Sequence, residues 1–405
     1  STLIGRLLHD SRSLLADHVT AIEAASRRRG LAAPDLSLLT DGLIAEREQG
    51  ITIDVAYRYF ATPARKFVLA DSPGHAQYTR NMVTAASTAD VAVLLVDAER
   101  GLQPQTRRHA LVSSWVGIRR VVLAVNKMDR VGWSLERFAE LADAFAALAR
   151  PLGFDDVTAI PMSALLGDMV VERGTRLDGW RGPTLLEALE SAPSRRDLRP
   201  AAAPFRFAVQ RVVRVPRGAG APGAPDEDFR GWQGTVSSGS VAVGDAVAVA
   251  ASGAVARVAR ILRLDREVGR ADADHAVTLT LDAEVDASRG DLIVAAGERP
   301  PLVRSIEADV CWFDAEPLVP GRAYRLKHGT RTVRAVPSAP TERIDVVSLA
   351  RVPGEGTLAM NDLGRVRLEV AAALPFEPYA EHRVGGAFVL IDEVTHRTVG
   401  AGVVR

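Results

Sequence analysis

The chain has 405 residues, its 50 lysines and arginines equal its 50 aspartates and glutamates, and 47% of its residues are hydrophobic. The balanced charge excludes a global electrostatic attraction to nucleic acid or to an acidic membrane surface, and no apolar run approaches the ~18 residues of a membrane-spanning helix. The single cysteine, Cys311, excludes an internal disulfide and a cysteine-cluster metal site. We therefore expect two or three domains, the cytoplasm as the default location, and neither nucleic acid nor membrane as a partner.

The first predicted element is an amphipathic helix that follows Ser1 and Thr2. Its apolar residues recur at the three- and four-residue spacing of one helix face. They are Leu3, Ile4, Leu7, Leu8, Leu14 and Leu15. The Ser-Thr pair is either an ordinary helix cap or the end of a phosphate loop, G-x-x-x-x-G-K-[ST], which also opens a helix. The helix alone does not decide between these interpretations.

Four apolar runs in the first half of the chain predict strands. Val, Leu and Ala follow one another in them with little polar alternation, which is typical of strands buried on both faces of a parallel sheet flanked by helices. The runs are residues 66–71, 91–98, 121–129 and 157–164. Residues 53–60 alternate more loosely and predict an edge strand of the same sheet. The first half of the chain is therefore predicted to be an α/β domain.

The second half has a different texture. Residues 191–205 are rich in proline and small residues and predict a linker. Beyond it, short Val-rich stretches broken by Gly-Asp, Ser-Gly and Gly-Ser turns predict two antiparallel β-barrels, and residues 217–229 predict a mobile excursion from the first of them. The predicted domains are residues 1–195, 203–299 and 301–405, with the Pro-Pro at 300–301 as the seam between the barrels.

Polar clusters follow three of the predicted strands, at the edge where parallel α/β sheets bind ligands. The residues that follow 121–125 and 157–162 suit the base of a guanine nucleotide. The carboxylate of Asp129 can accept two parallel hydrogen bonds from the N1 and N2 donors that guanine has and adenine lacks. Asn126 would tie loops around the base, the stem of Lys127 would lie over its face, and the backbone of Ser163 and Ala164 would meet its carbonyl.

The third cluster, "DSPGH" after residue 70, suits the phosphate end. Asp71 would hold Mg²⁺ through water, and Gly74 lets a backbone N–H reach the γ-phosphate. Thr52 would give its hydroxyl and carbonyl to the same ion and phosphate. The order of these elements along the chain, and a lysine inside Asn-Lys-x-Asp in a chain with three lysines, predict a GTPase that binds GTP or GDP with Mg²⁺. We then expect Ser1, with Thr2 beside it, to be the magnesium-binding end of a truncated phosphate loop.

Longer motifs resemble a known family. "EREQGITIDVAYRYF", "DSPGHAQYTRNMVTAASTADVAVLLVDA" and "NKMD" are similar to translation-factor-like GTPases, which carry two barrels after the GTPase domain. "TRNMVTAASTAD", "GLQPQTRRHALVSSWVGIRRVVLAVNKMD", "DFRGWQGTVSSGSVAVGD" and "DASRGDLIVAA" resemble the large, GTP-binding subunit of the heterodimeric bacterial sulfate adenylyltransferase. The resemblance covers essentially the whole chain.

The resemblance implies energy coupling. In that family a small partner subunit forms adenylyl sulfate from ATP and sulfate, and the large subunit hydrolyses GTP to drive the reaction. By the same resemblance His75 would orient the attacking water, Thr52 and the segment before it would form one switch, and residues 71–82 the other. Some relatives carry an adenylylsulfate kinase, so such a domain or partner is a further expectation. Ser72 and Ala85 depart from the family pattern without removing a named ligand.

Two other functions stay open on the sequence. A translation factor shares the fold, the switches and the barrels but carries RNA to the ribosome, which would favour basic and aromatic barrel surfaces. A catalytically silent scaffold is the other alternative, because the glycine-rich part of the phosphate loop is missing from the sequence. A normal phosphate loop upstream of Ser1 would dismiss the scaffold.

Overall fold

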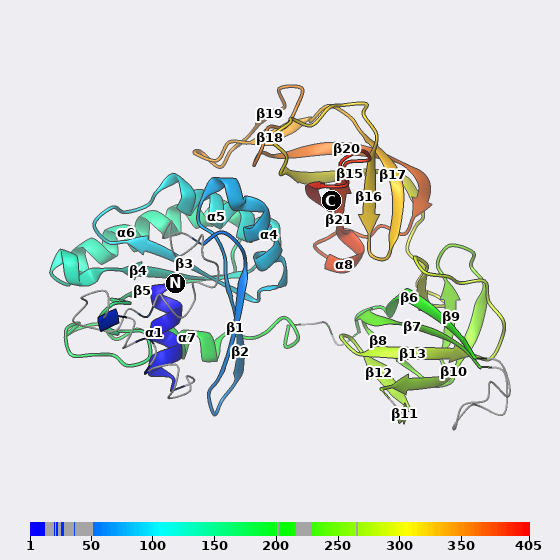
Figure 1. The fold of residues 1–405 in the computed structure, drawn as a ribbon, viewed down its shortest axis with the longest axis horizontal. Coiled ribbons are helices and arrows are strands. Elements are labelled where there is room, and N and C mark those ends of the chain that lie inside the picture. Colours follow the sequence, from blue (N-terminus) through cyan, green and yellow to red (C-terminus); the bar gives the residue numbers. More distant parts are fainter. Residues whose placement is uncertain are drawn as a thin grey trace. The chain divides into compact units, whose positions relative to one another are not determined.

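The computed structural model of the chain is shown in Figure 1. It describes residues 1–12, 52–198, 202–215, 229–264 and 266–405, together with the single positions 20, 22, 26, 27, 36 and 200. The chain divides into two compact units. Unit 1 is Ser1–Leu198 with Asp345–Ala350, and unit 2 is Arg199–Ile344 with Arg351–Arg405. The predicted excursion at 217–229 lies almost wholly outside the described residues, as do Leu14, Leu15 and the switch segment before Thr52.

Unit 1 alternates helices and strands. Its helices are α1 (Thr2–Asp10), η2 (Ala76–Tyr78), α4 (Thr79–Thr88), α5 (Pro104–Trp115), η3 (Met128–Val131), α6 (Leu135–Ala149), η4 (Arg150–Leu152) and α7 (Leu185–Ser191). Its strands are β1 (Ala56–Ala61), β2 (Lys66–Asp71), β3 (Val91–Asp97), β4 (Arg120–Asn126) and β5 (Asp156–Pro161). Among the described residues of the chain, no helix is long and apolar enough to cross a membrane.

A three-stranded parallel sheet, β3-β4-β5, forms the centre of unit 1. Successive residues of β4 face opposite sides: Val122 and Ala124 pack with α1 and α7, whereas Val121 and Leu123 pack with α5 and α6. The four helices thus cover both faces, as Figure 1 shows. This explains why the run at 121–125 has no polar alternation, and it confirms the predicted α/β class.

Strands β1 and β2 correct the predicted sheet. Residues 53–60 and 66–71 were expected in the parallel sheet, but in the described part of the chain β1 and β2 form a separate antiparallel pair. The four residues between them form a tight turn, in which Thr62 N donates to the Arg65 carbonyl at 2.8 Å. A connection this short forces an antiparallel pair, because a parallel pair needs a long crossover. The hairpin also has one exposed face, on which Val68 is 61% exposed.

The other face of the β1–β2 hairpin packs on the core of unit 1. Phe60 and Phe67 lie opposite each other in the register and stack with ring centroids 4.6 Å apart. Both contact the cluster that contains Leu3 and Leu7 of α1. The core therefore holds β2 in place, so that Asp71 ends this strand next to the start of α1.

Unit 2 begins with a closed six-stranded barrel. Strands β10-β13-β7-β6-β14-β9 are hydrogen-bonded in this order, and β9 closes the ring by pairing with β10 as well as β14. Trp232 lies in its core, and its Nε1 donates to the Ala287 carbonyl at 2.9 Å. The strands of this part are β6 (Arg206–Val215), β7 (Phe229–Ser238), β8 (Ser240–Ala242), β9 (Ala246–Val249), β10 (Val255–Arg263), β11 (Arg266–Val268), β12 (Arg270–Asp272), β13 (Ala276–Leu281) and β14 (Leu292–Ala295).

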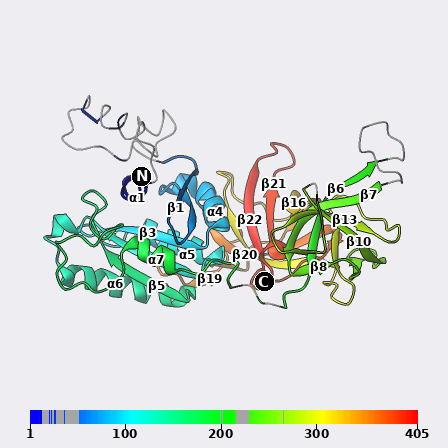
Figure 2. The ribbon, with the colours of Figure 1, turned by 90° about the horizontal axis from the view of Figure 1, so that it is seen from below.

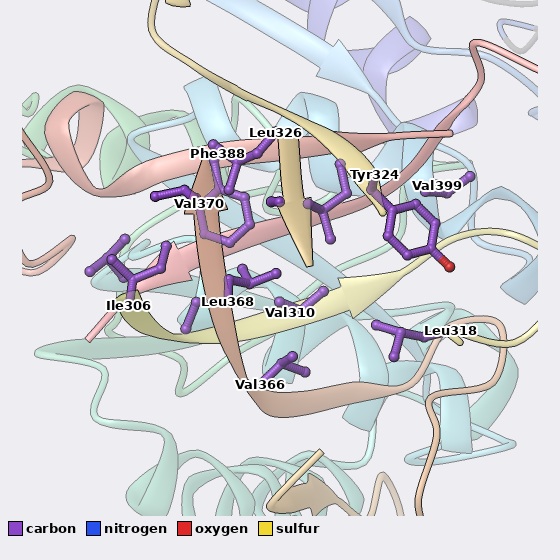
Figure 3. Close-up of a cluster of buried hydrophobic side chains, with 14 of the residues drawn as sticks. Ile306, Val310, Leu318, Tyr324, Leu326, Val366, Leu368, Val370, Phe388 and Val399 are labelled. Carbon is purple, nitrogen blue, oxygen red and sulfur yellow. The ribbon is translucent and has the colours of Figure 1, made fainter. Parts of the chain in front are cut away.

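A second closed barrel follows in unit 2. Strands β15-β22-β21-β16-β17-β20 form its ring, which β15 closes by pairing with β20; β21 and β22 are seen side by side in Figure 2. Side chains from alternate strand positions, such as Ile306 and Val310, fill its interior (Figure 3). Its elements are β15 (Val303–Trp312), β16 (Tyr324–His328), β17 (Arg331–Pro337), β18 (Glu342–Ile344), β19 (Arg351–Pro353), β20 (Leu363–Leu374), α8 (Arg383–Gly386), β21 (Ala387–Ile391) and β22 (Thr398–Val404).

A buried ion pair joins the two barrels within unit 2. Arg206, at the start of β6, donates to both carboxylate oxygens of Glu377, from Nε at 3.0 and 3.2 Å and from Nη2 at 2.9 Å. His382 Nδ1 lies 2.7 Å from the same carboxylate. Burial raises the pKa of Glu377, but the bonds from His382 and Arg206 outweigh it and lower the pKa overall. The two barrels are therefore tied by a charged contact in addition to their short connection.

Candidate nucleotide site

The carboxyl ends of the three parallel strands meet at one edge of the sheet. Asp97, the last residue of β3, lies opposite Asn126, the last residue of β4. On the other side of β4, Val125 lies opposite Pro161, the last residue of β5. The chain continues from β4 into Asn126–Asp129 and from β5 into Ser163 and Ala164. Two of the predicted clusters are thus brought together where parallel sheets bind their ligands.

Asn126 bridges the two loops that follow β4 and β5. Its Oδ1 accepts the backbone N–H of Ala164 at 2.8 Å. A backbone bond from Met128 to the Met162 carbonyl at 3.2 Å joins the same loops. Ser163 and Ala164 are almost fully buried. The loops therefore form one preorganised wall, in which the Asn126 amide acts as the crosslink.

Asp129 has an unsatisfied oxygen at this edge. It lies in η3, two residues after Lys127, which is the N-cap of η3 and has a left-handed φ of +65°. Oδ1 of Asp129 is buried and has no hydrogen-bond partner within the described part of the chain. A buried carboxylate oxygen without a partner is costly, and it indicates a ligand that donates hydrogen bonds. The two N–H groups on one edge of guanine fit this requirement.

Asp97 is a site residue that the sequence analysis missed. Its Oδ2 accepts from Lys127 Nζ at 2.7 Å, and its Oδ1 accepts from the backbone of Glu99 at 2.9 Å and Arg100 at 3.3 Å. Burial raises the pKa of Asp97, but these bonds outweigh it and lower the pKa overall. The carboxylate thus anchors the lysine of Asn-Lys-x-Asp. The signal for it was an aspartate at the end of an otherwise apolar strand.

Replacing Asp97 with asparagine should loosen Lys127. The pair is partly exposed, so its loss is expected to cost about 1 kcal/mol, or roughly fivefold in GDP affinity. The measurement is a fluorescence titration with labelled GDP. Glu99→Gln is the matched control, because Glu99 pairs with Arg130 at 3.4 Å on the surface, away from Lys127. Equal affinities of Asp97→Asn and the wild type would show that the anchor does not serve nucleotide binding.

The predicted phosphate end lies where α1 begins next to the end of β2. The backbone nitrogen of Ser1 is 3.8 Å from Oδ2 of Asp71. Ser1 occupies the N-cap position of α1, with Thr2 as the first helical residue, but its side chain forms no capping bond. The Ser1 hydroxyl is therefore not used by the helix. A serine hydroxyl and a carboxylate from neighbouring residues are a donor set that suits Mg²⁺ and its water shell.

Three other predicted residues flank the β1–β2 hairpin in the sequence. Gly74 and His75 follow β2, and Thr52 precedes β1. Gly74 and His75 are exposed, and His75 is the N-cap residue of η2. Thr52 is half-buried ahead of β1. Within the described residues, no side-chain hydrogen bond joins Thr52 or His75 to the other predicted site residues. The structure therefore assembles the base end of the candidate site more fully than the phosphate end.

Two family models and several curated proteins are similar to this chain. The family model described as "Elongation factor Tu GTP binding domain" matches residues 1–194, and "GTP-eEF1A C-terminal domain-like" matches residues 305–405. Sulfate adenylyltransferase subunit 1 of Methylorubrum populi is 49% identical over 100% of this chain and 84% of its own length. The Vibrio parahaemolyticus protein of the same name is 47% identical, with coverages of 100% and 83%.

Two further similarities are looser. The bifunctional enzyme NodQ of a Rhizobium species is 46% identical over 100% of this chain, but the chain spans only 61% of the NodQ length. A solved structure of sup35 complexed with GDP is similar at 22% identity and a TM-score of 0.45, with coverages of 100% and 90%.

The fold and the site define a translation-factor-like GTPase, with a guanine-nucleotide-binding domain followed by two antiparallel barrels. Within that class, relatives named as sulfate adenylyltransferase subunit 1 match this chain over its whole length. The chain belongs to the family of sulfate adenylyltransferase subunit 1. This membership favours sulfate activation over the translation-factor alternative.

Proposed function

We propose that this chain hydrolyses GTP as a subunit of a sulfate adenylyltransferase in the cytoplasm. The free energy of GTP hydrolysis would drive the formation of adenylyl sulfate and pyrophosphate. The substrates of that reaction, ATP and sulfate, would bind to a small partner subunit. The observation that carries the proposal is the end-to-end match to sulfate adenylyltransferase subunit 1, joined to a strand edge that presents a buried, unpartnered carboxylate oxygen. The proposed domains remain 1–195, 203–299 and 301–405.

The base of GTP would be read by the strand-edge residues. Asp129 would accept the N1 and N2 donors of guanine, and Lys127, anchored by Asp97, would lie over the base. Asn126 holds the wall formed by Ser163 and Ala164 in position. Because adenine presents an acceptor where guanine presents N1–H, the same residues would reject ATP, which leaves ATP to the partner subunit.

The phosphate end would carry the chemistry. Water would attack the γ-phosphorus in line to give GDP and phosphate, and Mg²⁺, when bound, would supply positive charge beside the phosphates. Ser1 and Thr52 would hold the ion through hydroxyls and Asp71 through water, with Thr2 beside them at the start of α1. Gly74 would present its N–H to the γ-phosphate, and His75 would orient the attacking water. Release of the γ-phosphate would free the Thr52 and Asp71–Met82 segments, which transmits hydrolysis to the partner.

The test is steady-state GTP hydrolysis by the full-length protein. It is measured alone, with a small adenylylating subunit, and with that subunit plus ATP and sulfate. We expect large stimulation only when all three additions are present, because coupling requires the partner reaction. Intact GDP binding without stimulation would contradict the proposal, and stimulation by ribosomes and RNA would assign the chain to translation.

A following reaction is also proposed. Adenylyl sulfate would be phosphorylated by an adenylylsulfate kinase domain or partner. The support is that NodQ is named as a bifunctional enzyme and extends well beyond the length matched here.

A further inference from the structure

His109 lies on α5 and contacts the backbone of Gly74. The two residues line the same cavity of about 270 Å³, which Asp97 and Gln105 also line. A Cβ atom placed on Gly74 would lie 3.8 Å from Cε1 of His109. Two segments that are far apart in the sequence therefore meet beside the proposed position of the γ-phosphate.

The ring of His109 lies close enough to the backbone of Gly74 for its N–H to donate to the Gly74 carbonyl oxygen. Burial lowers the pKa of His109, and Arg108 lowers it further, whereas the bond to the Gly74 backbone raises it. A backbone bond raises the pKa of an imidazole when the backbone atom accepts, since an acceptor stabilises the protonated ring. Because the pKa is lowered overall, the ring is neutral near pH 7 and uses its one N–H for this bond.

Helix α5 gives the His109 ring a fixed support. Gln103 and Thr106 form a capping box at the first turn of α5, and Ala110 is buried against the sheet. Gly74 and the residue after it are exposed and have no comparable packing. Because the Gly74 carbonyl and the next N–H belong to one planar peptide unit, a bond to that oxygen orients the plane from which His75 extends.

We infer that His109 is a positioning residue for GTP hydrolysis, whose ring holds the Gly74 carbonyl and thereby orients His75 toward the attacking water. This inference rests on the proposed function, in which His75 orients that water. His109 itself touches neither the water nor the nucleotide in this arrangement. Its loss should therefore slow the chemical step without weakening GTP binding.

Replacing His109 with methionine or with glutamine in the full-length protein is the matched test. The two new side chains have similar length and volume, but only glutamine carries an N–H that can replace that of the ring. We expect His109→Met to lower kcat about five- to tenfold at unchanged KM, which is the loss of one neutral hydrogen bond. His109→Gln should restore most of kcat. His109→Phe provides a second variant without a donor that keeps the planar shape.

Thermal unfolding and GDP affinity are measured for every variant, so that a folding defect is separated from a slow chemical step. Wild-type kcat in a folded His109→Met or His109→Phe protein would overturn the inference. So would a His109→Gln protein that binds GDP normally yet is as slow as His109→Met. Failure of the proposed function gives a different result, because the wild-type protein would then lack partner-dependent GTP hydrolysis.

Discussion

Replacing Asp129 with alanine is expected to weaken GDP binding by about 100- to 10,000-fold. The carboxylate would accept two charge-assisted hydrogen bonds from guanine, each contributing about 1.5–3 kcal/mol. Oδ1 of Asp129 is buried and unpartnered within the described residues, so the free protein already bears the desolvation cost that a bound guanine would offset. The measurement is calorimetric titration of the full-length protein with GDP.

Inosine diphosphate makes this experiment specific. It lacks the 2-amino group, so the wild-type protein should bind it about tenfold more weakly than GDP, which is the loss of one charge-assisted bond. Asp129→Ala should bind both nucleotides equally weakly. Asp143→Ala, at an exposed position of α6, is the control and should behave as the wild type. A variant that still prefers GDP over inosine diphosphate would show that another residue reads the base.

The strand edge could be predicted because its information is local. Each cluster directly follows an apolar run, and parallel strands bring their carboxyl ends together whatever their order in the sheet. Asn126 and Ala164 needed only this rule to be placed side by side, and they are joined at 2.8 Å. The two barrels were likewise predictable from short alternating strands and frequent turns.

The β1–β2 hairpin was mispredicted because an apolar run does not specify its partner. The run at 66–71 contains Val68, which a parallel sheet would bury but which is 61% exposed in the hairpin. The stronger signal was the short turn at 62–65, since its length permits only an antiparallel connection. Chain geometry, rather than hydrophobicity, determined the pairing here.

Asp97 and His109 could not have been found from motifs. Asp97 contacts Lys127 across two strand ends, and His109 lies against Gly74 from helix α5. Each acts on a motif residue through a tertiary contact, and nothing in the spacing of either residue records that contact. The motifs thus identify the groups that would touch the nucleotide, whereas the contacts by which Asp97 and His109 hold those groups become visible only in the folded chain.

His75→Ala is expected to lower kcat for GTP hydrolysis about 100-fold or more while KM changes little, because positioned proton-transfer and water-orienting groups typically contribute 10²–10⁴-fold. The geometry leaves the side chain available for this role. His75 is exposed at the N-cap of η2, and its side chain forms no capping bond there. Its backbone carbonyl instead accepts from Tyr78 at 3.0 Å, which fixes the turn but not the ring.

The conservative variant His75→Gln separates water positioning from folding. An amide can still donate to and accept from a water molecule, so this variant should retain more of kcat than His75→Ala, and both should bind GDP as the wild type does. Single-turnover hydrolysis with saturating GTP and the partner subunit gives the chemical step directly. If both variants hydrolyse GTP at the wild-type rate, His75 does not orient the water. The search for the water-orienting group would then move to Thr52 and to the segment that precedes it.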